Sequence, residues 1–231
     1  SRENDVFGVS VDTSANGDVI VAGASGDTLS LGKVWIYSRN SSSWSAAGGL
    51  SASNAEQNDG LGRYVAISGD GNTIVASALG EDSAAQGING DESDNSLSSA
   101  GAVYIFTNDG SDWSQQAYIK PSNTTCNNLM QFGSSIDISN DGNTVVIGAT
   151  GEGSGTSGVN GNQCDNGGIG GSNDSINDGS GAAYVFTRSG TTWSQQAFIK
   201  SSNPERYDRF GASVSMSSDG NTIAVGAYGE D

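Results

Sequence analysis

The stretch "SSDGNTIAVGAYGED", residues 217–231, decides the fold because the chain contains it in four copies. The other copies are "SGDGNTIVASALGED" at residues 68–82, "SNDGNTVVIGATGEG" at 139–153 and the looser "SANGDVIVAGASGD" at 14–27. Each copy contains an Asp–Gly or Asn–Gly pair, where glycine can adopt the positive φ that a tight hairpin turn requires. A short run of β-branched and small residues follows, which is typical of a strand. The sequence therefore predicts four β-hairpins, whose first strands begin at Phe7, Leu61, Phe132 and Phe210.

A second kind of hairpin alternates with the first. Its copies are "GKVWIYSRNSSSWSAAGGL" at residues 32–50, "GAVYIFTNDGSDWSQQAYIK" at 101–120 and "GAAYVFTRSGTTWSQQAFIK" at 181–200. One hairpin of each kind makes a four-stranded antiparallel meander. The first strands start 54, 71 and 78 residues apart, and nearly all of this variation lies in the connection between the two kinds of hairpin. Four-stranded sheets repeated at this period predict an all-β fold, a β-propeller of four-stranded antiparallel blades.

The chain would form about three and a half blades of a single propeller or propeller segment. The expected blades span approximately residues 5–53, 59–123, 130–203 and 208–231. Four hairpins of the first kind stand against three of the second, so the last blade lacks its outer half. We therefore expect these residues to be a segment of a longer chain, or to be completed by another subunit.

Composition restricts the partners. The chain has 231 residues, of which 26 are acidic, 9 are basic and none is histidine, giving a net charge of −17. Nucleic acid and anionic membrane surfaces are not expected partners, because phosphate binding needs clustered lysine and arginine. No apolar stretch approaches the roughly 18 residues of a membrane span. A strongly acidic surface suits solubility in salt and divalent cations.

The order "FG…DG…VGA" followed by "GAVYIF" resembles the FG-GAP repeat of the integrin α-subunit propeller. The fuller pattern is similar to the integrin-α-like repeats of bacterial and algal surface proteins, and the resemblance covers essentially the whole chain. It implies an extracellular, secreted or cell-surface module that takes part in adhesion and binds a protein or glycan ligand through loops on one face. The chain departs from the family in one respect. Calcium-binding blades of integrins carry several carboxylates between the first two strands, whereas each turn here supplies one, which is too few for a good Ca²⁺ site.

Acidic residues recur at two places in the repeat. One set ends the second strand, at Asp27, Glu81, Glu152 and Glu230, and the other stands two places before the first strand, at Asp5, Asp59 and Asp208. Because these two strands are antiparallel, the carboxylates should lie near one another on one face. Nearby carboxylates repel unless a cation, an arginine or backbone amides intervene. Arg63 and Arg209 could serve, so the sequence leaves open loop-bracing hydrogen bonds and cation binding.

One of the long connections between the two kinds of hairpin is a candidate calcium loop. The stretch "GEDSAAQGINGDESDNSLSSAG", residues 80–101, offers oxygen ligands at alternate positions, the spacing that Ca²⁺ loops use. The candidate ligands are Glu81, Asp82, Asp91, Ser93 and Asn95. A weaker analogue at residues 171–181 contains Asp174, Asn177 and Asp178.

Three tryptophans, Trp44, Trp113 and Trp193, occupy one place in the fourth strand. A repeated large residue suits packing between adjacent blades, and we expect Trp113 and Trp193 to be mostly buried. The alternative is that exposed tryptophans stack on sugars, as in a lectin.

The chain has two cysteines, Cys126 and Cys164. In a propeller their two connections emerge on the same face of one blade, close enough for a disulfide, which would place the protein outside the cytosol. Three Asn-x-Ser/Thr sequons, at Asn40, Asn123 and Asn173, are candidate glycosylation sites.

No catalytic set is visible in the sequence. Histidine is absent, neither cysteine has an activating partner, and the paired carboxylates recur by symmetry, whereas an active site normally breaks symmetry. We therefore expect a non-enzymatic adhesion or ligand-binding module. The main alternative is a structural subunit of an extracellular filament, sheath or coat, whose partners are neighbouring subunits, and a carbohydrate-binding lectin comes after it.

Overall fold

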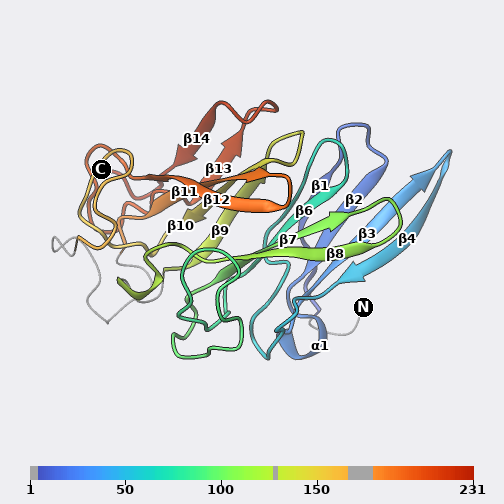
Figure 1. The fold of residues 1–231 in the computed structure, drawn as a ribbon, viewed down its shortest axis with the longest axis horizontal. Coiled ribbons are helices and arrows are strands. Elements are labelled where there is room, and N and C mark those ends of the chain that lie inside the picture. The colour runs from blue at the N-terminus through green and yellow to red at the C-terminus, as the bar shows by residue number, and fades with distance from the viewer. Residues whose placement is uncertain (1–4, 127–129, 166–178) are drawn as a thin grey trace.

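The computed structural model describes residues 5–126, 130–165 and 179–231, and in it the chain folds almost entirely into antiparallel strands (Figure 1). Three sheets have four strands and one has two, and we call these sheets with their connections units 1 to 4. Unit 1 contains β1 (Phe7–Thr13), β2 (Val19–Ala24), β3 (Lys33–Asn40) and β4 (Ser43–Leu50). Unit 2 contains β5 (Val65–Ile67), β6 (Thr73–Ala78), β7 (Ala102–Asn108) and β8 (Trp113–Ile119). Unit 3 contains β9 (Phe132–Ile138), β10 (Thr144–Ala149), β11 (Ala182–Ser189) and β12 (Thr192–Ile199), and unit 4 contains β13 (Ser213–Met216) and β14 (Ile223–Gly226). Two single helical turns, α1 (Asp27–Ser30) and η1 (Thr124–Cys126), lie in the connections.

Strand order within every sheet follows chain order, as a meander requires. Each strand pairs with the next in an antiparallel register; in unit 2, for example, Ala76 lies opposite Tyr104, which lies opposite Tyr118. The pairing between third and fourth strands shifts by a bulge at one equivalent place in units 1, 2 and 3. Bulges increase the local twist of a sheet, so the three four-stranded sheets share the same bend.

The repeated turn sequence makes the same hydrogen bonds in each copy. In unit 2 the Ser68 hydroxyl donates to the Asp70 carboxylate and accepts the Thr73 amide at 3.0 Å, while Asp70 also accepts the Asn72 amide at 2.9 Å. Gly71 has a φ of +76°, as this turn requires. Units 3 and 4 repeat these contacts, and unit 1 makes them with Asn16 in place of the aspartate. The repeated turn is therefore held by local hydrogen bonds within each hairpin, as the sequence predicts.

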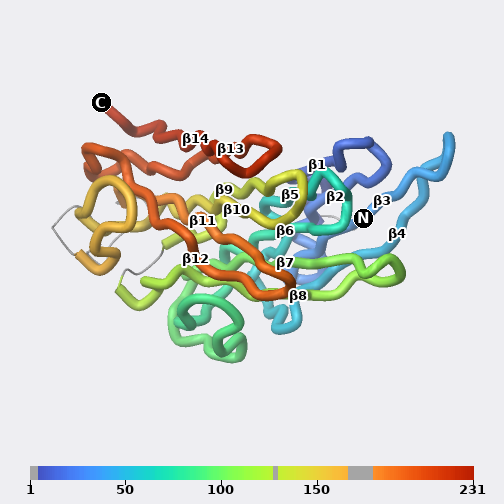
Figure 2. Tube along the Cα trace, turned by 45° about the horizontal axis from the view of Figure 1, so that its top comes forward, coloured from blue at the N-terminus to red at the C-terminus, as the bar shows by residue number. Residues whose placement is uncertain are grey.

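The units lie side by side, with their first strands together. β1 contacts β5, β5 contacts β9 and β9 contacts β13, and the C-terminal hairpin lies next to unit 3 (Figure 2). The sheets of units 2 and 3 each lie between two other units. Both of their faces are apolar, because alternate residues of a strand point to opposite faces of its sheet and so pack against different neighbouring units. In β6, Ile74 and Ala76 join a core shared with unit 1, whereas Val75 joins a core shared with unit 3. This explains why the second strands read as continuous apolar runs.

Glycines form the joint between consecutive units. The first strands of units 2 and 4 begin at Val65 and Ser213, later than the predicted Leu61 and Phe210. The glycines after the predicted starts, Gly62, Gly133 and Gly211, have φ values of +88°, +94° and +91°. A Cβ on Gly211 would lie 2.2 Å from the Ala182 carbonyl oxygen, and one on Gly148 would lie 2.0 Å from the Gly211 oxygen. The two backbones therefore touch, and the glycines of the repeat are required by this contact rather than by the turns alone.

The three repeated tryptophans differ in burial, because neighbouring sheets cover them to different extents. Trp193 is 5% exposed, and its Nε1 donates to Gln116 of unit 2 at 2.9 Å, which confirms the packing prediction for this residue. Trp113 is half-buried against the core between units 1 and 2. Trp44 is 45% exposed, because no sheet among the described residues covers the outer face of unit 1.

We predict that Gly211→Ala lowers the free energy of unfolding by about 3 kcal/mol or more. The new Cβ combines the cost of positive φ, about 1–2 kcal/mol, with overpacking, about 1–3 kcal/mol. Gly190→Ala is the matched control, because Gly190 also has a positive φ but a Cβ there meets nothing within 4 Å. Urea unfolding measures both variants. Equal losses would show that the joint tolerates a side chain.

Candidate functional site

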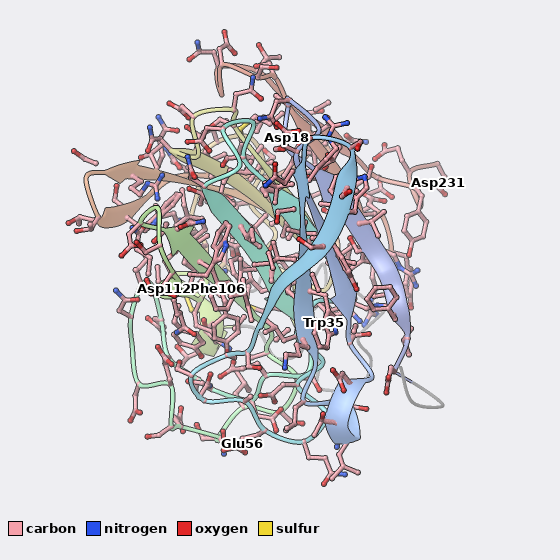
Figure 3. All side chains as sticks on the ribbon, turned by 90° about the vertical axis from the view of Figure 1, so that its right-hand side faces the viewer. Asp18, Trp35, Glu56, Phe106, Asp112 and Asp231 are labelled. Atoms are coloured by element: carbon pink, nitrogen blue, oxygen red, sulfur yellow. A yellow bond between two sulfur atoms is a disulfide. The ribbon has the colours of Figure 1, made fainter. Side chains whose placement is uncertain are left out.

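The strands run between two ends of the molecule, and the long connections gather at one of them. We call this the loop end; it comprises connections 51–64, 79–101 and 200–212 and the described parts of 120–131 and 150–181. Figure 3 shows Glu56 at the loop end and Asp18, in the turn between β1 and β2, at the opposite end. Most of the acidic positions singled out in the sequence lie at the loop end.

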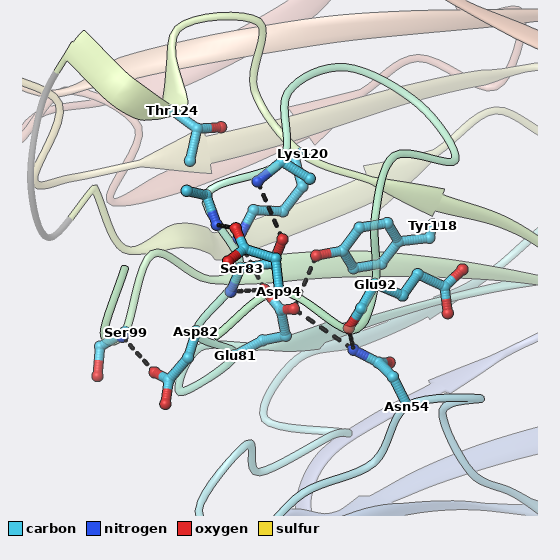
Figure 4. Close-up of polar contacts among 12 residues, drawn as sticks. Asn54, Glu81, Asp82, Ser83, Glu92, Asp94, Ser99, Tyr118, Lys120 and Thr124 are labelled. Carbon is cyan, nitrogen blue, oxygen red and sulfur yellow. Dashed lines mark hydrogen bonds and ion pairs between the residues drawn. The ribbon is translucent and has the colours of Figure 1, made fainter. Parts of the chain in front are cut away.

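A buried ion pair lies at the root of the longest fully described loop. The Lys120 Nζ atom lies 2.7 Å from Glu81 Oε2, and both side chains are essentially excluded from solvent (Figure 4). The other oxygen, Oε1, accepts the Tyr118 hydroxyl at 2.7 Å, and Oε2 also accepts the Ser83 amide at 3.2 Å. Asn54, from the connection between units 1 and 2, donates to Oε1 at 3.4 Å. Every acceptor of this carboxylate thus has a donor inside the protein.

Unit 3 contains the same arrangement. Lys200 Nζ lies 2.6 Å from Glu152 Oε2, and the Ser154 amide donates to Oε1 at 3.0 Å. Asn123, from the connection between units 2 and 3, donates to Oε1 at 3.2 Å and accepts the Tyr184 hydroxyl at 2.7 Å. In unit 2 the Tyr104 hydroxyl likewise donates to Asn54 at 2.7 Å. Lysine, glutamate, asparagine and tyrosine therefore form one network, which occurs twice.

Burial controls the protonation of these networks. It lowers the pKa of Lys120 and of Lys200, and the partner glutamate opposes this shift in each case. Burial also raises the pKa of Tyr104, Tyr118 and Tyr184. The tyrosines therefore remain protonated at neutral pH, and their hydroxyls donate the hydrogen bonds that help to hold the loop roots in place.

The sequence predicted carboxylates at these places but not the lysines that neutralise them. The available signal was that "QQAYIK" and "QQAFIK" both end in lysine, whereas the hairpin of unit 1 does not. Arg63 and Arg209, which the sequence offered as one way to neutralise the acids, lie against the rings of Tyr64 and Tyr228. The ammonium groups of Lys120 and Lys200 thus lie beside Glu81 and Glu152, where the sequence allowed a bound cation.

The second set of acids braces the connections between units. The Asp59 carboxylate accepts the Glu56 amide at 2.8 Å, and its carbonyl accepts the Gly80 amide at 3.1 Å. Asp208 makes the equivalent bonds with Glu205 and Gly229, and the Asp5 carbonyl accepts the Gly26 amide. Met130 occupies this position in unit 3 and is wholly buried in the core. In unit 1, Asp27 is half-exposed and accepts the Thr28 hydroxyl, and in unit 4 Glu230 is exposed.

The pKa of Asp59 is raised to about 6, mainly by desolvation and in addition by the nearby charges of Glu81 and Asp82. The Glu56 amide opposes this shift. Asp59 also lines a shallow pocket of about 270 Å³ between units 1 and 2, together with Ser25, Ser30, Asn58, Gly60, Arg63, Leu79 and Gly80. The Asp59 carboxylate therefore titrates closer to neutral pH than an ordinary aspartate does.

The five candidate calcium ligands do not converge in the structure. Glu81 is held by Lys120, and Asp82 accepts the Ser99 amide at 2.6 Å. Asp91 accepts the amide and hydroxyl of Ser93, at 3.0 and 2.6 Å, and so forms a local turn. Asn95 donates to Glu56 at 2.9 Å.

Residues 5–126, 130–165 and 179–231 contain no group of three or more acidic, histidine or cysteine side chains arranged around a common point. The side chains as placed therefore do not fit a calcium site, and calcium binding stays a prediction of the sequence. Asp174, Asn177 and Asp178 of the weaker candidate lie outside the described residues.

The two cysteines form the expected disulfide, with their Cα atoms 5.2 Å apart. It joins the connection after β8 to the connection after β10 and closes a loop of 38 residues. By the chain-entropy argument such a link contributes about 3–4 kcal/mol. The disulfide therefore secures the loop end of unit 3 beside the Glu152 network.

The sequons have different surroundings. Asn123 is 1% exposed and uses both polar atoms of its amide in the Glu152 network, an arrangement that leaves no room for a glycan, and glycosylation there stays a prediction of the sequence. Asn40 is exposed at the end of β3 and stays a prediction. Asn173 lies outside the described residues.

Comparison with known proteins supports the resemblance at the C-terminal part of the chain. Residues 193–231 match the FG-GAP repeat family, as the sequence predicts. No curated protein sequence matches the chain. The fold is similar to the crystal structure of a candidate 6-phosphogluconolactonase from Bacteroides uniformis, with a TM-score of 0.50 and 11% identity. That match covers 94% of this chain, which spans 46% of the other protein, and at this identity it bears on the fold alone. The described helices are single turns, none of which could cross a lipid bilayer.

We predict that Lys120→Met lowers the free energy of unfolding by about 3–5 kcal/mol, because it leaves the buried Glu81 carboxylate without a counter-charge. Adding Glu81→Gln to this variant should recover part of the loss. Arg39→Met is the control: Arg39 also lies 2.8 Å from an acid, Asp18, but both side chains are more than a third exposed, and such pairs contribute about 0–1 kcal/mol. Denaturant unfolding of the four proteins measures this. Similar losses for Lys120→Met and Arg39→Met would contradict the assignment.

We predict that Asp59→Asn removes a pH-dependent part of the stability. The folded pKa of about 6 exceeds the ordinary value of 3.8, so protonation of Asp59 stabilises the fold. The contribution of protonated Asp59 to the free energy of unfolding is complete below about pH 4 and is lost as pH rises through 6. Two pKa units correspond to about 2.7 kcal/mol, of which solvent screening leaves roughly 1–2 kcal/mol. The variant should therefore gain stability relative to the wild type between pH 4.5 and 7.5, as measured by urea unfolding at constant ionic strength. A constant difference across this range would overturn the assignment.

Proposed function

We propose that this chain, which carries an FG-GAP repeat at residues 193–231, is a non-enzymatic ligand-binding or adhesion module of an extracellular protein and acts through its loop end. The observation that carries the proposal is the construction of loop 79–101. A buried ion pair fixes its root, and hydrogen bonds fix its interior, while several of its acidic and polar side chains remain exposed.

A β-propeller arc is the architecture that accounts best for the arrangement of the sheets. The four first strands adjoin one another in chain order, every sheet is an antiparallel meander, and each internal sheet buries both faces against its neighbours. Radial stacking of four-stranded blades has these properties. On this proposal the chain supplies three complete blades and half of a fourth.

The loop end offers an acidic surface to a partner. Asp91, Ser93 and Asn95 are exposed on loop 79–101, whereas Lys120 and Lys200, which follow β8 and β12 at the loop end, are buried. Because these two lysines are paired with Glu81 and Glu152 in the interior, they do not neutralise the exposed acids of the loop end. The proposed ligand is a protein or glycan that presents cationic or hydrogen-bond donor groups.

The carboxylates at the loop end are poorly suited to acid–base catalysis. Glu81 and Glu152 are bound by lysines in sites closed to solvent, and the chain contains no histidine. We therefore propose a binding role rather than an enzymatic one. The disulfide and the FG-GAP repeat both support an extracellular location, since disulfides persist in oxidising compartments.

A structural role is the second candidate, and the outer face of unit 1 favours it. Phe7, Val11 and Trp44 are 48%, 63% and 45% exposed, whereas Leu61, Val65 and Trp193 at the equivalent places are nearly buried. A neighbouring subunit of a filament or coat could cover this face. The lectin alternative is weaker, because Trp193 packs between units and is not available to a sugar.

Charge reversal at one end of the molecule tests the proposed binding face. Asp91→Lys changes the loop end and Asp109→Lys changes the opposite end; both aspartates are exposed, accept amides in local turns, and give the same change in net charge. The chains are passed over an array of extracellular-matrix proteins and glycans, in calcium buffer and in chelator. We expect Asp91→Lys to weaken binding at least tenfold, as loss of complementary charge does, and Asp109→Lys to bind as the wild type.

Equal effects of the two variants would contradict the loop-end assignment, and absence of binding to the array would contradict the binding role. Ordered polymers of the wild-type chain in negative-stain microscopy would favour the structural role. The calcium and chelator arms also test the calcium prediction, because a ligand interaction that needs calcium is lost in chelator.

A further inference from the structure

A pocket of about 270 Å³ lies at the loop end, at the junction between units 1 and 2. Ser25 and Ser30 line it from the connection after β2, and Asp59, Arg63 and Leu79 line it from unit 2. Both units contain all four strands, so both walls of the pocket are present in the structure. The volume is just below the range of about 300–1,000 Å³ that holds drug-sized ligands, so the pocket suits a smaller molecule.

The pocket is open because unit 2 has a glycine, Gly60, directly before its predicted first strand. Units 3 and 4 have Gln131 and Arg209 at this place. The Thr150 hydroxyl donates to the Gln131 side chain at 2.7 Å, and the Arg209 guanidinium donates to the Tyr228 hydroxyl. Side chains thus fill this place in units 3 and 4, whereas Gly60 leaves it open in unit 2.

Backbone hydrogen bonds fix the walls of the pocket. The Gly60 amide donates to the Ser30 carbonyl of unit 1 at 2.9 Å, which joins the two units beside the pocket. The Gly80 amide donates to the Asp59 carbonyl at 3.1 Å, and the Asp59 amide donates to the Glu56 carbonyl at 3.3 Å. A ligand therefore enters a site whose backbone is already ordered, which reduces the entropy that binding costs.

Several polar side chains of the lining have unused hydrogen-bonding capacity. The hydroxyls of Ser25 and Ser30 and the side-chain amide of Asn58 bond to no other group in the part of the chain that the structure describes. Asp59 is 5% exposed, and its Oδ2 atom accepts the Glu56 amide at 2.8 Å. Its Oδ1 atom has no donor among the described residues, although an ionised carboxylate accepts several hydrogen bonds. One small ligand can therefore contact several of these groups.

Arg63 adds a cationic donor to the lining. Its guanidinium lies over the Tyr64 ring, 5.9 Å from the centroid. Neither Arg63 nor Asp59 forms an ion pair with any residue that the structure describes. The pocket therefore presents an acceptor and a cationic donor that do not neutralise each other.

This set of groups matches a neutral ligand that is rich in hydroxyls. A hydroxyl both donates and accepts, so neighbouring hydroxyls can donate to Asp59 and accept from Arg63. Arg63 disfavours an ammonium, and the charges of Glu81 and Asp82, which act on Asp59, disfavour an anion. Leu79 supplies apolar surface for the C–H groups of a sugar ring.

We propose that this pocket is a subsite for one neutral monosaccharide unit. Two neighbouring hydroxyls of the sugar bind the Asp59 carboxylate and the Arg63 guanidinium, and its C–H face lies on Leu79. The hydroxyls of Ser25 and Ser30 bind the rest of the ring. The inference rests on the proposed binding role of the loop end and selects a glycan from among the proposed ligands. It does not involve the repeated tryptophans, on which the lectin alternative depends.

Nuclear magnetic resonance tests the proposal, with the methyl glycosides of glucose, galactose, mannose, fucose and N-acetylglucosamine as probes. We expect at least one of them to bind with a Kd on the order of 1 mM, as a small ligand does in a shallow site. The bound sugar should shift the amide signals of Gly60 and Gly80. Failure of every probe to bind, or binding that shifts only signals outside the pocket, would overturn the proposal.

Gly60→Gln gives unit 2 the side chain that unit 3 has at this place, and it should weaken binding at least tenfold by filling the pocket. The variant is expected to fold, because a Cβ at Gly60 comes no closer than 3.7 Å to another atom and Gln131 also has a positive φ, +50°. Gly110→Gln is the matched control: Gly110 has a positive φ in an open turn at the opposite end. Equal sugar binding by the two variants would contradict the assignment.

Asp59→Asn separates the role of the carboxylate from that of the cavity. The amide has the shape of the carboxylate but accepts through one oxygen only, so the variant should bind the sugar at least tenfold more weakly. Asp109→Asn, at an exposed aspartate of the opposite end, should change the affinity less than twofold. The amide spectrum of each variant reports whether it is folded. Unchanged affinity of a folded Asp59→Asn variant would refute the proposed contact.

Oligosaccharides that end in the bound sugar identify the source of the ligand. Binding of both the oligosaccharide and the methyl glycoside would identify the end of a glycan, and binding of the methyl glycoside alone would identify a free sugar; both results support the pocket.

Charge reversal at Asp91 distinguishes this inference from the proposed function. If Asp91→Lys weakens binding to the array and no sugar probe binds, the pocket proposal alone fails. If Gly60→Gln abolishes sugar binding while Asp91→Lys and Asp109→Lys bind the array alike, the pocket is supported and the acidic loop is not the binding face.

Discussion

Backbone-to-backbone contact at the glycine joints is the constraint on which the structure depends. Gly62 and Gly211 bring the start of one sheet against the second and third strands of the previous sheet, at distances that exclude any side chain. This approach sets the spacing between units, and the spacing allows each internal sheet to bury both faces. The apolar runs of the second strands, the placement of Trp193 and the order of the first strands all follow from it.

The lysine–glutamate networks fix the long loops, as the glycine joints fix the spacing of the sheets. Each combines a glutamate after the second strand, a lysine after the fourth, and an asparagine from the connection that enters the unit. Burying two charges costs several kcal/mol per ion, which the pair repays only when further hydrogen bonds satisfy it. Here tyrosine, serine and asparagine donors provide those bonds, so the networks fix the position of long loops at modest net cost.

Loop structure and surface charge are linked through these networks. The lysines that hold the loop roots are removed from the surface together with their partner glutamates, while Asp91 at the loop end and Asp109 at the opposite end remain exposed. Part of the same network is present in unit 4, where the Asn203 amide donates to the exposed Glu230 carboxylate.

The sequence by itself determined the strands, the turns and their pairing within each hairpin, because these rest on local patterns such as "SxDGNT" that act over a few residues. It also identified the acids at the loop end and the cysteine pair. Only the tertiary structure decided the partners of those acids. Lys120 lies 39 residues from Glu81 in the chain, and burial rather than spacing makes their pairing obligatory. For the same reason Asn123 matches a glycosylation motif yet is buried, and the candidate calcium ligands separate into local turns, since contacts between units override short-range patterns.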